Sequence, residues 1–475
     1  MLYYLGIDIG TTSTKALAVT TEGKQLALAR AGYPTLSPQD GYQEQAPEAV
    51  LIAVISVLKD IDEQTGVRPQ AVGLSCAMHS LIVLDSKGQP LTNAMLWSDR
   101  RSQEQAQQLT ASGVGKALYQ ATGTPIHPMS PLCKLRWLRE RQAGLFAQAA
   151  RFVSIKEYIL QRLCGAWAVD YSIASATGLM DIIQLKWWEP ALAYAGIAEG
   201  QLSPLASPTH LLALNNDALP ARQQGTPVAL GANDGCLANL GALALGPDEQ
   251  VLTVGTSGAI RRTGRAPVVQ AEAQIFNYRL DETYFVSGGA TNNGGIAFEW
   301  LAGLLGRERL SEAAAAHVPA GSEGLLFLPY LLGERAPIWD ANATSAFLGL
   351  RLRHGPAHLH RAVLEGVAFS LYHIAEQMPK QPGRLIANGG FTQSDLWLQL
   401  FADVFGTPVW VDEQAEASAL GAAYVAMKAT GAISSYESLY PLRRLLRQYL
   451  PDAANHEAYR EVFRKFKASG PGSGR

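Results

Sequence analysis

The amino-acid sequence predicts a two-domain α/β protein, and three observations support this prediction. The chain has 475 residues, too many for one ordinary hydrophobic core, so two domains of similar size are expected. A short strand followed by a Gly-Thr turn occurs once in each half of the chain. Around both copies, strand-like apolar segments mix with helix-like ones, which is typical of α/β domains.

The repeated segment comprises residues 5–15 (LGIDIGTTSTK) and residues 251–258 (VLTVGTSG). In each copy an apolar strand leads into Gly-Thr followed by Thr or Ser, and a second β-prone segment follows, which predicts a β-hairpin. The turn of such a hairpin exposes N–H groups and hydroxyls that can hold a phosphate. The two turns suggest a duplicated fold that closes on one polyphosphate, with chance similarity as the alternative for so short a match.

Five further segments have clear local patterns. Strands are expected at residues 70–75 and 81–85, and a buried strand ending in a glycine turn at residues 386–390. Helices are expected over residues 396–405 and 417–429, because neither stretch contains a proline that would break it.

The domain boundary is placed near residues 241–250, where Gly246-Pro247-Asp248-Glu249 interrupts the pattern. This predicts an N-terminal domain over residues 1–243 and a C-terminal domain over residues 244–467. Residues 468–475 are expected to form a flexible tail, since they contain nothing to bury.

The composition excludes several kinds of partner. The formal net charge is −2 and no Lys/Arg run stands out, so neither nucleic acid nor an anionic membrane surface is an expected partner. The four cysteines are far apart and form no CxxC pair, which is typical of reduced thiols in a cytoplasmic protein. We see neither a signal peptide nor an apolar run long enough to span a bilayer.

Two acidic residues have surroundings that suggest chemistry. Asp8 stands on an apolar strand two residues before the first turn, where a carboxylate is costly to bury unless it meets a cation. Mg²⁺ shared with phosphate oxygens is the natural cation, and an Asp that caps the turn is the alternative. Asp234 lies among small residues in Gly231-Ala232-Asn233-Asp234-Gly235, predicted to be a loop, where a substrate hydroxyl could approach a general base. An ordinary turn is the alternative there.

Two longer segments resemble the signatures of the FGGY carbohydrate kinases. Residues 345–350 (SAFLGL) with 358–365 (HLHRAVLE) resemble the C-terminal signature, and residues 129–138 (MSPLCKLRWL) the N-terminal one. Arg141 departs from the polar amide or acid expected near the end of the latter, at a helix surface where it matters little. The resemblance extends from about Leu5 to about Gly431.

The resemblance implies an ATP-dependent kinase with two RNase H-like (actin-like ATPase) domains, an interdomain active-site cleft that closes on its substrates, and Mg²⁺ at Asp8. Asp234 would be the catalytic base. The residues that would bind ATP are Gly10, Thr11, Thr12, Gly255, Thr256, Ser257, Gly295, Glu299, Gly389, Gly390 and Ser394. Glycine suits such positions because backbone can approach the ligand closely.

On the sugar side, the resemblance is strongest to the gluconate-phosphorylating branch, with xylulose kinases next. It implies substrate contacts from Met78, His79, Ser80, Trp97, Asp99, Arg100, Lys156 and Asn233. A sugar acid needs a cation for its carboxylate, and the candidates are His79, His127, Lys134, Lys156 and Arg100. Arg101 could be a solvated charge. A non-catalytic actin-like ATPase and a sugar sensor are the alternatives from other classes, and a homodimer is left open.

Overall fold

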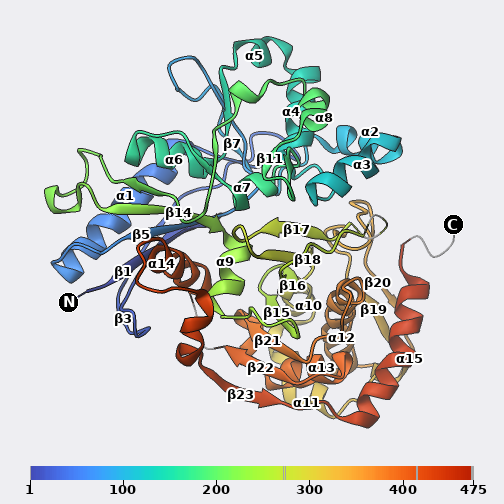
Figure 1. Ribbon diagram of the computed structural model, residues 1–475. Coiled ribbons are helices and arrows are strands. Elements are labelled where there is room, and N and C mark those ends of the chain that lie inside the picture. Colours follow the sequence, from blue (N-terminus) through green and yellow to red (C-terminus); the bar gives the residue numbers. More distant parts are fainter. Residues whose placement is uncertain (1, 271, 273, 413, 415, 472–475) are drawn as a thin grey trace. The chain divides into compact units, whose positions relative to one another are not determined.

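The computed structural model describes the chain except residues 1, 271, 273, 413, 415 and 472–475, and it divides into two compact units (Figure 1). The first unit comprises Met1–Leu243, Gly264–Val286 and Glu416–Arg443. The second unit comprises Ala244–Thr263, Ser287–Ala415 and Arg444–Arg475. The first break follows Leu243, where the sequence analysis divides the chain. Two later segments nevertheless return to the first unit, so neither unit is continuous in sequence.

The main sheet of the first unit has the strand order β13-β14-β5-β1-β2-β3. β1 and β14 both run parallel to β5, whereas β2 returns antiparallel to β1. The strands of this sheet are β1 (Tyr4–Ile9), β2 (Ser13–Val19), β3 (Gln25–Gly32), β5 (Val72–Cys76), β13 (Leu211–Ala213) and β14 (Pro227–Asn233). The prediction of a strand at residues 70–75 is therefore confirmed as β5.

Helices and short strand pairs complete the first unit. The helices are α1 (Pro47–Thr65), α2 (Gln103–Ala111), α3 (Gly113–Thr122), α4 (Pro131–Arg141), α5 (Ala143–Gln148), α6 (Ile155–Cys164), α7 (Tyr171–Ser175), α8 (Glu189–Ala195), α9 (Asp234–Gly241) and α14 (Ala417–Ala429). The short strands include β4 (Glu44–Gln45) with β7 (Ala94–Met95), β6 (Ile82–Leu84) with β8 (Arg151–Val153), β9 (Val169–Asp170) with β12 (Leu205–Ala206), β10 (Met180–Asp181) with β11 (Lys186–Trp187), and β17 (Phe276–Arg279).

Helix α14 belongs to the first unit because glycines let it pack directly against the sheet. A Cβ at Gly6 in β1 would lie 1.7 Å from the Ala419 carbonyl oxygen, and one at Gly73 in β5 would lie 1.9 Å from that of Ala422. Only glycine permits so close an approach of helix backbone to strand backbone. Figure 1 shows α14 beside β1 and β5. The helix has the bounds predicted, 417–429, although the sequence analysis assigns it to the C-terminal domain.

The second unit repeats the strand–turn–strand motif. Its sheet includes the order β18-β16-β15-β21-β22-β23. These strands are β15 (Glu249–Val254), β16 (Gly258–Gly264), β18 (Phe285–Thr291), β21 (Arg384–Asn388), β22 (Val409–Asp412) and β23 (Leu445–Tyr449), and a separate pair joins β19 (Leu326–Leu328) to β20 (Ala346–Leu348). The helices are α10 (Gly295–Leu305), α11 (Glu312–Ala316), α12 (Pro356–Ala375), α13 (Asp395–Phe405) and α15 (Ala453–Ser469).

Both predicted hairpins are confirmed. In the first unit the antiparallel pairing of β1 with β2 ends at Ile9 and Thr14, which leaves Gly10-Thr11-Thr12-Ser13 between the paired residues. In the second unit β15 and β16 pair up to Val254 and Gly258, which leaves Gly255-Thr256-Ser257 in the turn. Thr12, Gly255 and Thr256 are exposed, so both turns present polar groups at the surface of their own unit.

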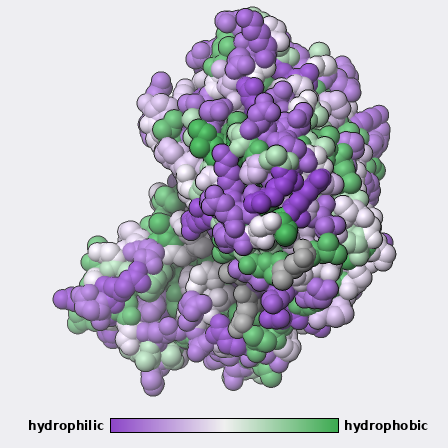
Figure 2. Space-filling model, turned by 90° about the vertical axis from the view of Figure 1, so that its left-hand side faces the viewer, coloured by the Kyte–Doolittle hydropathy of each residue, from purple (hydrophilic) through white to green (hydrophobic). Residues whose placement is uncertain are grey.

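Hydrophilic residues gather at the surface (Figure 2), although 48% of the chain is hydrophobic. The face shown in Figure 2 is mostly hydrophilic, with hydrophobic residues scattered between polar ones. Among the described residues, no helix has the length and apolar character needed to cross a membrane. Of the predicted flexible tail, residues 468 and 469 belong to α15, and residues 472–475 lie outside the described part of the chain.

Candidate active site

The candidate catalytic residues of the first unit meet at one edge of its sheet. Because β1, β5 and β14 are parallel, their carboxyl ends lie together, and ligands of open α/β sheets bind at such ends. In register, Asp8 on β1 is beside Ser75 on β5, and Cys76 lies between Ile9 on β1 and Asn233 on β14. Two carboxylates that are far apart in sequence thus stand at the same edge of the sheet, Asp8 on β1 and Asp234 directly after β14, with β5 between these two strands.

Asp8 is held by its neighbour strand. Its Oδ1 accepts a hydrogen bond from the Ser75 hydroxyl at 2.7 Å. Burial raises the pKa of the Asp8 carboxyl, while Ser75 and Lys15 favour the charged form and oppose this shift. The described residues contain no group of three or more His, Cys, Asp or Glu side chains that could hold a metal by themselves. A single carboxylate nevertheless fits Mg²⁺ that is bound chiefly by phosphate oxygens and water.

The turn after Asp8 is fixed by side chains from three directions. The Tyr33 hydroxyl donates to the Gly10 carbonyl at 2.6 Å, and the Trp97 indole Nε1 donates to the Thr11 hydroxyl at 3.1 Å. Gln45 Nε2 donates to the Thr11 carbonyl. These bonds hold the turn in one shape, which pre-organises it for an anion. The sequence analysis predicts that Trp97 touches a sugar. In the structure its indole contacts the turn that is predicted to bind phosphate.

Asp234 begins helix α9, whereas the sequence analysis predicts a loop. Strand β14 ends at Asn233, and Asn233 is the N-cap of α9: its Oδ1 accepts from the Cys236 N–H at 2.8 Å. Asn is a good N-cap because its side chain satisfies an amide that has no helical partner. Asp234 is therefore half-buried in the first turn of the helix, where its Oδ1 accepts from the Gly235 N–H at 2.8 Å. The helix dipole favours a negative charge at this end.

Five of the residues predicted to touch substrate are buried, and their polar groups bind protein. His79 bonds through Nδ1 to the Ala176 carbonyl at 2.7 Å and through Nε2 to the Tyr278 hydroxyl at 3.1 Å. Ser80 Oγ accepts from the Ile155 N–H at 3.0 Å. The buried five are His79, Ser80, Asp99, Lys156 and Asn233. In this structure they support the site from within the protein, and Met78, Trp97 and Arg100 keep accessible surface.

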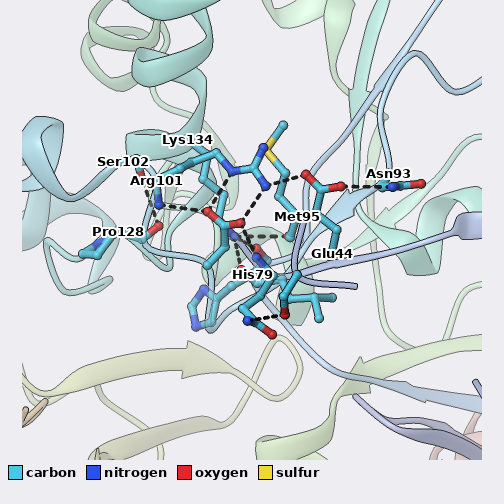
Figure 3. Close-up of polar contacts among 12 residues, drawn as sticks. Glu44, His79, Asn93, Met95, Arg101, Ser102, Pro128 and Lys134 are labelled. Carbon is cyan, nitrogen blue, oxygen red and sulfur yellow. Dashed lines mark hydrogen bonds and ion pairs between the residues drawn. The ribbon is translucent and has the colours of Figure 1, made fainter. Parts of the chain in front are cut away.

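Lys134 is buried, with no exposed surface, and lies among the polar contacts around His79, Met95 and Arg101 (Figure 3). Its Nζ donates to the carbonyls of His79 at 2.7 Å, Leu96 at 2.7 Å and Met95 at 3.3 Å. Burial lowers the pKa of Lys134 to about 7, and the Asp99 carboxylate opposes this shift. Lys134 was a candidate cation for a carboxylate substrate. Its hydrogen bonds instead connect the segment at His79 to the segment at Met95 and Leu96.

Arg101 is also part of the interior framework and is not a solvated charge. Its guanidinium bonds to Asp99 at 2.7 Å and Glu44 at 2.5 Å and lies 3.8 Å from the centre of the Tyr42 ring. Asp99 accepts in addition from the Gln43 N–H at 2.8 Å. Asp99 and Arg101 therefore neutralise one another, and Asp99 is 1% exposed.

A cavity of about 560 Å³ opens in the second unit beside its Gly-Thr turn. This volume is typical of pockets for small ligands. Six of the predicted nucleotide residues line it, namely Gly255, Thr256, Gly295, Glu299, Gly390 and Ser394. Ser257 and Gly389 are not among the described residues that line it. Gly389 instead has φ of 103°, and a Cβ there would lie 2.6 Å from the Val254 carbonyl oxygen, so it brings β21 against β15.

The walls of this cavity were not predicted from the sequence. Their apolar part includes Ile296, Phe298, Leu310, Leu364, Phe391 and Trp397, and the polar side chains of Arg307, Glu312, His360 and Gln393 also line the cavity. The Phe391 and Trp397 rings meet edge to face with centroids 5.8 Å apart. In a sequence such residues are indistinguishable from core residues. The available signal was Phe391 directly after Gly389-Gly390.

The segment that leads into α10 is anchored by a buried acid, Glu334. Its carboxylate accepts from the Thr291 hydroxyl at 2.7 Å and from the Arg335 N–H at 2.7 Å. Burial raises the pKa of Glu334 to about 7, while the hydrogen bond from Thr291 opposes the shift. Thr291 ends β18, and Gly295 at the start of α10 lines the cavity. Glu334 therefore anchors the end of β18, shortly before Gly295 in the chain.

A polar strand edge in one α/β unit and an apolar cavity beside a matching Gly-Thr turn in the other define an actin-like phosphotransferase architecture. The chain belongs to the FGGY family of carbohydrate kinases: residues 3–241 match the N-terminal domain of that family and residues 251–430 the C-terminal domain. The fold class and the enzyme class predicted from the sequence are thus confirmed.

Individual relatives have full-length similarity. Gluconokinase of Bacillus licheniformis is 38% identical over 98% of this chain and 94% of its own length. A ligand-bound xylulose kinase structure from Lactobacillus acidophilus is 34% identical, with a TM-score of 0.94 over 98% of this chain and 97% of the other. A gluconate kinase structure from the same organism is also 34% identical, with a TM-score of 0.91 over 98% and 96%.

Proposed function

We propose that this enzyme transfers the γ-phosphoryl group of ATP to the 6-hydroxyl of D-gluconate and yields 6-phosphogluconate. The observation that carries the proposal is the position of Asp234, a half-buried acid at the strand edge shared with Asp8. The similarity to gluconokinases over nearly the whole chain supports the choice of acceptor.

Phosphoryl transfer needs positioning, charge neutralisation and one group that takes the hydroxyl proton. Asp234 would accept that proton, since its carboxylate stands at a strand end among small residues. Gly10, Thr11 and Thr12 would bind phosphate oxygens from one turn, and Gly255, Thr256 and Ser257 from the other. The aromatic cavity would hold the adenosine, with Glu299, Gly390 and Ser394 at its polar positions. Mg²⁺, when bound near Asp8, would neutralise phosphate charge.

The carboxylate of gluconate needs a cationic side chain, and a side chain that is buried within the protein cannot reach it. Lys134 and Lys156 are 0% and 1% exposed and bind protein groups, and His79 is buried as well. Arg100 is exposed, and its guanidinium makes no hydrogen bond or ion pair with the part of the chain that the structure describes. We therefore assign the carboxylate to Arg100, with half-buried His127 as the second candidate.

The test is a panel of gluconate, xylulose and glycerol with ATP, scored by ADP release and by mass analysis of the product. A hydrogen bond to a charged group contributes about 1.5–3 kcal/mol, so the bond from Arg100 to the carboxylate should give gluconate an advantage of at least about tenfold in kcat/KM over the neutral acceptors. Xylulose is the second candidate substrate, since a xylulose kinase is among the similar structures. Equal or better use of xylulose would overturn the gluconate assignment and leave the kinase assignment standing.

The substitution Arg100→Gln tests whether Arg100 binds the carboxylate of gluconate. The variant should raise KM for gluconate about tenfold and leave KM for xylulose unchanged, because only gluconate carries the charge that Arg100 meets. Arg141→Gln is the matched control, since Arg141 is an exposed arginine of the same unit on helix α4 and pairs with Glu104. An equal effect of Arg100→Gln on both acceptors would contradict the assignment of Arg100.

A further inference from the structure

A buried ion pair in the first unit has no part in the reaction described so far. Lys156 on α6 and Asp170 at the start of α7 join through Nζ and Oδ2 at 2.7 Å, and their side chains are 1% and 0% exposed. The sequence analysis predicts substrate contact for Lys156, which its burial does not support. Removing two charges from water is costly, and apolar residues of similar size often stabilise a fold as well as such a pair does. Fold stability alone therefore does not explain why this ion pair is buried at this place in the first unit.

The first connection from this pair leads to β14, the strand that ends directly before Asp234. Lys156 Nζ donates to the Ala232 carbonyl at 3.2 Å. The β14–β5 register shifts between Ala229 and Ala232, so this part of β14 is bulged. A Cβ at Gly231 would lie 1.9 Å from the Leu74 carbonyl oxygen, which shows how closely the bulge approaches β5. A bulge redirects the residues that follow it, and Lys156 binds this one two residues before Asp234.

The second connection runs through the other oxygen of the carboxylate. Asp170 Oδ1 accepts from the Ile173 N–H at 2.8 Å and so caps α7. Within that helix Ser172 Oγ accepts from the Asn233 N–H at 3.0 Å and from Asn233 Nδ2 at 2.9 Å. Asn233 in turn caps α9, whose first residue is Asp234. Lys156 and Asp170 are therefore connected to Asp234 by two separate sets of hydrogen bonds, one through Ala232 and the other through Ser172 and Asn233.

We infer that Lys156 and Asp170 are positioning residues that fix the direction of the Asp234 carboxylate toward the acceptor hydroxyl. This inference rests on the proposed role of Asp234 as the base. Neither residue touches the reacting atoms. A displacement of about 1 Å at a reacting group can cost about 100-fold in rate, so a rigid support behind the base has a kinetic effect.

The test uses the full-length enzyme and the double substitution Lys156→Met with Asp170→Asn. Both charges are removed together, so no charge is left buried alone, and Asn can still accept from the Ile173 N–H. We expect kcat to fall at least about tenfold, with KM and Kd for ATP unchanged, because the nucleotide cavity belongs to the second unit. Arg222→Met is the control: it breaks the pair with Asp62 elsewhere in the same unit and should leave kcat unchanged.

A double-mutant cycle with Asp234→Ala separates positioning from a general loss of structure. If the pair acts through Asp234, adding the pair substitution to Asp234→Ala should change kcat by less than about threefold. A similar loss in both backgrounds, or an unchanged kcat in the pair variant alone, overturns the inference. Normal turnover of the Asp234→Ala variant would instead contradict the proposed role of Asp234 as the base, and the positioning role of the pair would be contradicted with it. Asp170→Asn alone is the fallback variant, and if neither variant folds, the pair serves the fold and the inference is overturned.

Discussion

At the scale of single residues, Asp234 has the surroundings of a base that must stay ionised. It is half-buried, it stands in the first turn of α9, and it accepts from the Gly235 N–H. The bond from the Gly235 N–H holds the carboxylate in one orientation, and a carboxylate held in this way can accept a proton from a hydroxyl group.

The substitution Asp234→Ala should lower kcat by about two to four orders of magnitude, the usual contribution of a positioned base. Kd for ATP should stay within about twofold, because the aromatic cavity lies in the other unit. Steady-state kinetics and calorimetric titration with ATP measure the two quantities. A variant with near-normal turnover would exclude Asp234 from the mechanism.

We expect Glu334 to make the stability of the enzyme depend on pH. Its folded-state pKa of about 7 is raised above the ordinary value of 4.5, mainly by burial. The folded state therefore favours the neutral form of Glu334 more than the unfolded state does. The stabilisation is complete below about pH 4.5, and it is lost as the pH rises through about 7.

Glu334→Gln removes this titration and keeps the size of the side chain. We expect the difference in Tm between wild type and variant to change steadily from pH 4.5 to pH 7.5, in the direction that disfavours wild type at the higher pH. Thermal unfolding in a series of buffers measures it. A difference that is constant over this range would show that Glu334 does not titrate there.

At the scale of elements, the contact of α14 with the sheet leaves no room for a methyl group. Gly73→Ala would force a Cβ to within 1.9 Å of the Ala422 carbonyl oxygen, so strand or helix has to move. Overpacking of this kind costs about 1–3 kcal/mol, and more where backbone has to shift. Denaturant unfolding should therefore show a clearly lower free energy for Gly73→Ala. Gly113→Ala on α3 is the control, since nothing lies within 4 Å of its Cβ, and equal stabilities would contradict the close packing.

The elements that the sequence predicts best are those whose pattern is local. The two hairpins follow from Gly-Thr turns between apolar strands, and the bounds of α14 follow from an Ala-rich stretch without proline. The start of α9 was missed, because Asn-Asp-Gly is also a common turn and the capping bond from Asn233 depends on the backbone of β14. The burial of Asp99 and Lys156 could not be predicted, since their partners Arg101 and Asp170 look like ordinary surface charges in the sequence.

At the scale of the whole molecule, the family relationship defines the enzyme class, and each unit carries a distinct set of candidate ligand residues. The sequence could not show that residues 264–286 and 416–443 return to the first unit, because that depends on contacts between segments far apart in the chain.

Hydrogen exchange can test the assignment of ligands to units. ATP alone should slow amide exchange around Gly295 and Phe391 in the second unit, because bound adenosine would restrict the cavity walls. Gluconate alone should instead slow exchange around Met78 and Arg100 in the first unit. Mass spectrometry of peptides measures both, with glycerol as the control ligand. Protection of the cavity by gluconate, or of the Met78 loop by adenosine alone, would contradict the assignment.

The return of α14 to the first unit has a consequence for how the protein is made. Strands β1 and β5 leave the ribosome early, but the helix that packs on Gly6 and Gly73 ends at residue 429 of 475. The first unit therefore cannot be completed until most of the chain has been synthesised, although domains usually fold in order from the N-terminus. Until then the glycine-lined side of its sheet lacks its cover. A nascent chain arrested near Leu243 should consequently bind chaperones, and one extended beyond α14 should be released.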